Sequence, residues 1–159
     1  MPSVLAFAFA ALALPATWVH YENPRFGYEI SFPPNFVEQG PAPTNGDGLV
    51  FVTTDGTQLL RVYGGNIIEG DFKAALGRAM DAATDAGWDL SYKRVSGTWA
   101  SYSGTRSDMI LYARAIALCG GTQYASFEIE YPYADLEPMN LTIEMLVASL
   151  KATGNGIDC

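Results

Sequence analysis

The segment YARAIALCGGTQYASFEIEYP, residues 112–132, decides the fold because it sets two strand-like runs around a Gly-Gly pair. In both runs apolar and polar residues alternate with a period of two, which is typical of half-buried β-strands. The residues expected to face the core are Met109, Leu111, Ala113, Ala115 and Ala117 in the first run, and Ala125, Phe127, Ile129 and Tyr131 in the second. The segment therefore predicts an antiparallel hairpin.

Matching the apolar faces of the two strands fixes the expected register, since a slip of one residue would turn every side chain over. A three-residue loop, Gly120 to Thr122, pairs Ala115 with Phe127 inside and Arg114 with Glu128 outside. A two-residue loop would set Ala113 against Glu128, an apolar residue against a charged one. We therefore expect the three-residue loop.

Two further segments upstream read as strands. In residues 26–32, Phe26, Tyr28, Ile30 and Phe32 share one parity, and Pro33-Pro34 ends the run. In residues 49–65, Asp55-Gly56 separates two β-branched runs, a strong signal for a tight hairpin. Pairing Thr54 with Thr57 places Phe51 opposite Leu60 on a core face.

Helices are predicted near residues 71–86 and 137–151. Asp71 can cap the first helix and Gly87 can end it, and apolar residues recur between them at helical spacing. Two more strands, 88–95 and 98–104, are expected to turn at Ser96-Gly97. No internal repeat interrupts this order.

The segment YENPRFGYEISFPPNF, residues 21–36, is followed by a hairpin, a helix, antiparallel strands and a C-terminal helix. This order resembles the PsbP/Mog1-like superfamily, in particular its small bacterial envelope members of unknown role, over roughly residues 21–150. The resemblance implies an α+β fold, with a single antiparallel sheet of five or more strands packed between helices in an α/β/α sandwich. It also implies proteins that bind or assist other proteins rather than catalyse.

Composition limits the partners. The chain has 159 residues, 49% of them hydrophobic, which fits one globular domain over residues 17–159. Its 17 acidic and 9 basic residues give a formal charge of −8, with the basic residues dispersed. Nucleic acid and anionic membrane surfaces are therefore not expected as partners. An envelope protein is the expected partner, and the sequence leaves the oligomeric state open.

The N-terminus predicts a signal peptide over residues 1–16. An uncharged apolar run from Val4 to Leu14 ends in small residues, with Ala11-Leu12-Ala13 matching an A-x-A cleavage site. The run is shorter than the about 20 residues that span a bilayer. We expect a mature chain beginning between Leu14 and Trp18, periplasmic or secreted and without membrane insertion after cleavage. The alternative is a buried N-terminal helix or strand of the domain.

The two cysteines, Cys119 and Cys159, are predicted to form a disulfide. The strand from Gln123 to Tyr131 travels roughly 30 Å away from Cys119, and the last helix returns roughly 22 Å, so the tail ends near the hairpin loop. An oxidising compartment would then favour the bond. The alternative is a small buried thiol at Cys119 with Cys159 free.

No catalytic, cofactor or metal site is predicted. His20, the only histidine, has no nucleophile motif beside it, and no phosphate-binding glycine loop is present. Glu128 and Glu130, with Asp108 nearby, could serve a small enzyme that uses dispersed carboxylates. Arg106 and Arg114 favour cross-strand ion pairs with them instead.

The expected function is therefore that of an exported, non-enzymatic binding or assembly protein of the bacterial envelope, with the small enzyme as the alternative. Tyr63, Tyr92 and Trp99 are the predicted partner-binding surface, because strand alternation could leave them on a sheet face that the helices do not fully cover. A second helix layer would instead bury them as core.

Overall fold

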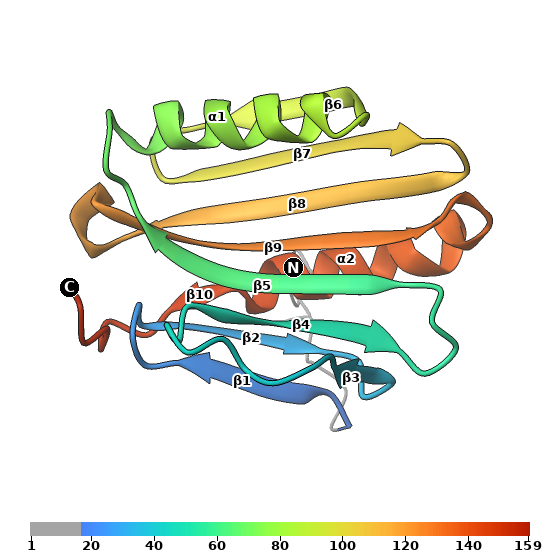
Figure 1. Ribbon diagram of the computed structural model, residues 1–159, viewed down its shortest axis with the longest axis horizontal. Helices are drawn as coiled ribbons and strands as arrows, with labels where there is room; N and C mark the ends of the chain where they lie inside the picture. Colours follow the sequence, from blue (N-terminus) through green and yellow to red (C-terminus); the bar gives the residue numbers. More distant parts are fainter. Residues whose placement is uncertain (1–16) are drawn as a thin grey trace, which may run out of the picture.

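The computed structural model describes residues 17–159, and it contains two antiparallel sheets and two helices (Figure 1). The small sheet has the order β1-β2-β10, with β1 at Val19–Asn23, β2 at Tyr28–Phe32 and β10 at Lys151–Ala152. The large sheet has seven strands in the order β3-β4-β5-β9-β8-β7-β6.

The elements of the large sheet and the helices follow one another closely along the chain. The strands are β3 (Phe36–Glu38), β4 (Gly48–Thr53), β5 (Leu59–Asn66), β6 (Asp89–Val95), β7 (Trp99–Arg106), β8 (Met109–Leu118) and β9 (Gln123–Pro132). The helices are α1 (Phe72–Asp85) and α2 (Leu136–Ser149), with single 3-10 turns η1 (Cys119–Gly121) and η2 (Tyr133–Asp135). The predicted α+β class and antiparallel pairing are confirmed.

The prediction of a single sheet is wrong, because the strand predicted over residues 26–32 lies in the small sheet. β2 pairs with β1 and β10 and buries Tyr28, Ile30 and Phe32 against the large sheet. Alternation in a sequence shows that one face of a strand is buried. It does not show whether that strand joins the edge of a sheet or packs on its face.

Each face of the large sheet carries a core of its own. The first core joins β2 and α2 to one face, with members such as Phe127, Ile129 and Leu146. The second joins α1 to the opposite face, with Leu76 packed near Leu111 and Ala113. The two helices therefore lie on opposite faces of the sheet, as a sandwich requires.

The predicted register of the β8–β9 hairpin is also wrong. The structure pairs Arg114 with Phe127 and Ala113 with Glu128, and its loop has four residues because Leu118 pairs with Gln123. The prediction assumed a single buried face. In the structure β8 turns its alanines toward α1, whereas β9 turns Phe127 and Ile129 toward α2 and β2, so matching apolar faces does not fix the register.

The predicted pairing of Phe51 with Leu60 and the predicted ends of the first helix are confirmed, whereas Thr54 and Thr57 lie in the β4–β5 loop and the last helix ends at Ser149, before β10. Phe51 pairs with Leu60 across the β4–β5 turn, where Gly56 has φ +75°. The Asp71 side chain accepts from the Ala74 N–H at 2.9 Å at the start of α1, and Gly87 follows its end with φ +94°. Among the described residues, no helix is long and apolar enough to cross a membrane.

Candidate binding site

A cavity of about 360 Å³ opens between α1 and the strands β5 and β9. Three alanines of the helix and Ala86 after its end line it, and their short side chains leave the space open. The lining residues are Arg61, Tyr63, Ala79, Ala82, Ala83, Ala86, Trp88, Arg106, Leu111, Glu128 and Glu130. We call this cavity the α1 pocket.

Glu128 and Glu130 reach the α1 pocket from alternate positions of β9, and each is satisfied by neighbouring donors. The Tyr63 and Tyr102 hydroxyls both donate to Oε1 of Glu128, at 3.0 and 3.2 Å. Arg61 forms an ion pair with Glu130 and has a nitrogen 3.9 Å from Oε2 of Glu128. The carboxylates are thus held in a network that spans β5, β7 and β9.

Arg106 closes the side of the α1 pocket near the end of the helix. Its guanidinium lies 4.2 Å from the centre of the Trp88 ring, donates to the Ala86 carbonyl at 2.9 Å, and lies 3.4 Å from Glu130. The predicted pairing of Arg106 with a β9 carboxylate is therefore present. The predicted pairing of Arg114 with Glu128 is wrong, since Arg114 lies on the other face of the sheet, and Asp108 does not line the pocket.

The hydrogen-bond network makes the stability of the fold depend on pH in the alkaline range. Burial raises the pKa of the Tyr63 and Tyr102 phenols, and the Glu128 carboxylate raises both further. In the unfolded chain a phenol ionises near pH 10. The folded protein holds these protons to higher pH, so their contribution to stability is complete below about pH 10 and is lost as the pH rises above it.

We therefore expect the free energy of unfolding to fall steeply above about pH 10, and Tyr102→Phe to make that fall shallower. Urea denaturation from pH 7 to pH 11 measures this. Between pH 7 and pH 9 the free energies of unfolding of the variant and the wild type should differ by a constant amount, because neither phenol titrates there in either state. An alkaline slope identical in variant and wild type would contradict the assignment.

The structure separates the three residues predicted as a partner surface. Tyr63 lines the α1 pocket. Tyr92 lies on β6 with 40% of its surface exposed, and Trp99 lies half-buried on β7. Both project from the sheet face opposite α1, so the three do not form one surface.

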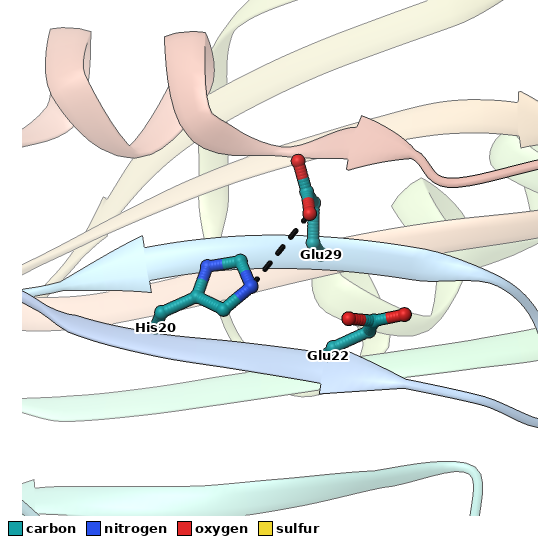
Figure 2. Close-up of side chains that lie close together, drawn as sticks. All are labelled: His20, Glu22 and Glu29. Carbon is teal, nitrogen blue, oxygen red and sulfur yellow. Dashed lines mark ion pairs between the residues drawn. The ribbon is translucent and has the colours of Figure 1, made fainter.

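A second group of polar side chains lies on the small sheet, where the register of β1 and β2 places Glu22 opposite Glu29 (Figure 2). His20 Nε2 lies 3.6 Å from Glu29 Oε2, and one ligand atom from each of the three residues lies within 4.8 Å of the others. Such a set could hold a divalent cation. More than half of the His20 side chain, 54%, is exposed, and exposed acidic groups commonly gather without a metal. The sequence analysis missed this group because only the β1–β2 pairing assembles it.

The disulfide between Cys119 and Cys159 is present, and the tail it holds lies over the turn between β1 and β2. The N–H groups of Thr153, Ile157 and Asp158 donate to carbonyls of residues 24–27 at 2.9 to 3.1 Å. The Asp158 carboxylate pairs with Arg25 at 2.7 Å. The bond therefore joins the β8–β9 loop to the small sheet through an ordered tail.

No family model matches the chain, and no curated protein matches it in sequence. Among solved structures, cyanobacterial PsbP (CyanoP) from Synechocystis superposes with a TM-score of 0.66 at 14% identity, covering 92% of this chain and 98% of that one. The Ran-binding protein Mog1p of Saccharomyces cerevisiae gives 0.60 at 12% identity, covering 86% and 95%. The fold is therefore PsbP/Mog1-like, as the order of elements predicts.

Proposed function

We propose that the protein is an exported, non-catalytic binding or assembly protein of the bacterial envelope, and that the α1 pocket receives a polar group of its protein partner. The observation that carries the proposal is the closed network in the pocket. Glu130 is paired with two arginines, and Glu128 accepts from two tyrosine hydroxyls. Carboxylates fixed by ion pairs and tyrosine hydrogen bonds hold a defined orientation, which suits the recognition of a polar group.

Two further observations support the proposal. The disulfide favours an oxidising compartment, in agreement with the signal peptide predicted for residues 1–16, which lies outside the described residues. The fold is shared with Mog1p, a Ran-binding protein. The α1 pocket also presents donors and acceptors together, through its arginines, tyrosine and carboxylates, as a site that orients a polar side chain would.

The test is site-specific photo-crosslinking in the native envelope. A photoreactive phenylalanine analogue at Tyr63 should crosslink one envelope protein, and the same analogue at the exposed Lys73 of α1 should not. His20→Ala should leave the crosslink unchanged, because His20 lies on the small sheet.

The enzyme alternative uses the same carboxylates and predicts a different result. It requires substrate turnover by the purified protein that is lost in Glu130→Gln while the fold is kept. Such turnover, together with the absence of a specific crosslink at position 63, would overturn the binding proposal.

A further inference from the structure

The face of β6, β7 and β8 turned away from α1 carries two rows of polar and aromatic side chains. Strand pairing sets Arg94, Ser101 and Arg114 in one row across the three strands, and Tyr92, Ser103 and Tyr112 in the next. Trp99 precedes Ser101 on the same face of β7. We call this set the Arg114 face.

The Arg114 face is only partly covered. In Figure 1, α2 runs at the level of β9 and β5, and β6 and β7 lie beyond it. Tyr92 and Arg94 are accordingly exposed, whereas Trp99, Tyr112 and Arg114 are half-buried. β6 is also the outermost strand of the sheet, so nothing in the described chain continues the surface beyond it.

Arg114 is a half-buried cation without an anion. Its guanidinium lies 4.2 Å from the centre of the Trp99 ring and Nη1 donates to Ser101 Oγ at 3.0 Å, but its Nε is buried without an acceptor. Arg25 and Arg61, the other half-buried arginines, each pair with a carboxylate. Among residues 17–159, no carboxylate lies within the 4.0 Å ion-pair distance of Arg114.

The neighbours of Arg114 include a second positive charge. The same row holds a second cation, Arg94, across the buried Ser101. The Tyr112 hydroxyl donates to the same Ser101 Oγ, at 3.2 Å. Burial lowers the pKa of Arg114, as expected for a cation that has lost water and gained no counter-charge.

We propose that the Arg114 face binds an acidic segment of a partner protein, with a carboxylate of that segment on the Arg114 guanidinium and its apolar groups on Trp99 and Tyr92. A guanidinium stacked on an aromatic ring is pre-organised for planar, charge-assisted pairing with a carboxylate. The aromatic rings flanking it supply the area typical of protein recognition sites. Arg94 pairs with a second acidic residue of the segment.

This site lies on the opposite face of the sheet from the α1 pocket and goes beyond the function proposed for that pocket. Either can fail alone, because the photo-crosslink at Tyr63 reports only the pocket. A protein with both sites would hold two partners, or two parts of one partner, on opposite faces.

The test uses short peptides and the oxidised, ¹⁵N-labelled protein. The probe is the acetylated, amidated peptide Glu-Phe-Glu, and the matched neutral probe is Gln-Phe-Gln. The Trp99 indole N–H and the Arg114 Nε–H resonances report binding, and sodium acetate distinguishes a free carboxylate from an acidic segment. We expect saturable shifts with Glu-Phe-Glu, and binding at least about tenfold weaker with Gln-Phe-Gln and with acetate, since tenfold corresponds to the about 1.4 kcal/mol of one charge-assisted contact.

Variants then assign the binding to Arg114. Arg114→Met keeps an apolar side chain over Trp99 and should reduce binding of Glu-Phe-Glu by about the same tenfold factor. Arg78→Met, on the exposed side of α1, is the matched control and should leave binding unchanged. Equal binding of the two peptides to the wild-type protein would overturn the proposal even if Arg114→Met failed to fold, as would undiminished binding by a folded Arg114→Met. Acetate binding as tight as that of Glu-Phe-Glu would also overturn it, since it would indicate a simple anion site.

Discussion

Reduction of the Cys119–Cys159 disulfide is expected to lower the free energy of unfolding by about 4 kcal/mol. The bond closes a loop with a sequence separation of 40 residues, and in the chain-entropy model the loss follows from the freedom that the unfolded chain regains. The loop contains β9 and α2, which contribute to the first core, so the constraint acts on central elements rather than on a loose end.

Guanidinium denaturation with and without reductant measures this loss. The sequence contains two cysteines, both in this bond, so the reductant has one target. The double variant Cys119→Ser/Cys159→Ser should match the reduced protein and should not respond to reductant. A loss below about 1 kcal/mol would contradict this expectation, because the unfolded chain regains its freedom even if the hydrogen bonds between residues 153–158 and residues 24–27 still hold the tail in the folded protein.

The sequence predicts those parts of the fold that depend on neighbouring residues. The Asp71 cap, the turn at Asp55-Gly56 and the pairing of Phe51 with Leu60 all follow from local chemistry, and all are present. The Cys119–Cys159 bond was also predictable, because strand and helix rises place the tail near the loop.

The register error arises where a strand has two buried faces. β8 carries alanines at odd positions and Ile110, Tyr112, Arg114 and Ile116 at even positions, and this pattern predicts that the alanines face a single core. In the structure the alanines make room for α1, and Ile110 and Leu118 belong to the other core. One period-two pattern cannot show that both sides are covered. The strand in residues 26–32 was misassigned for another reason, since alternation does not show whether a strand joins the edge of a sheet or packs on its face.

The candidate sites also depend on strand pairings that the sequence pattern did not predict. Tyr63 and the β9 carboxylates were each identified in the sequence, but as separate features, because only the β5–β9 pairing places Arg61 opposite Glu128. Tyr102 and Arg61 were missed. Arg114 was assigned to Glu128 through the wrong register, and with the correct register it faces Phe127 and has no acidic partner among the described residues.

Phe127→Ala is expected to lower the free energy of unfolding by about 3 to 5 kcal/mol. Phe127 is fully buried at the centre of the first core, paired with Val62 on one side and Arg114 on the other, and its ring is stacked with that of Tyr112 at 6.1 Å. Removing the ring loses the transfer free energy of the apolar atoms and leaves a cavity that rigid strands cannot close. Ile68→Ala is the control, since Ile68 is 90% exposed and its loss should change stability by no more than about 0.5 kcal/mol.

Ile110→Ala then distinguishes the two readings of β8. Ile110 is 7% exposed and belongs to the same core as Phe127, so its truncation should cost about 2 to 5 kcal/mol by guanidinium denaturation of the oxidised protein. A strand with one buried face, carrying its odd-numbered residues inward, would leave Ile110 in solvent and predict a change near that of Ile68→Ala. A cost of 2 kcal/mol or more at Ile110 supports two covered faces, because Leu111 beside it is buried against α1. A change of about 0.5 kcal/mol or less would instead indicate that β8 has one buried face and that Arg114 lies on its solvent side.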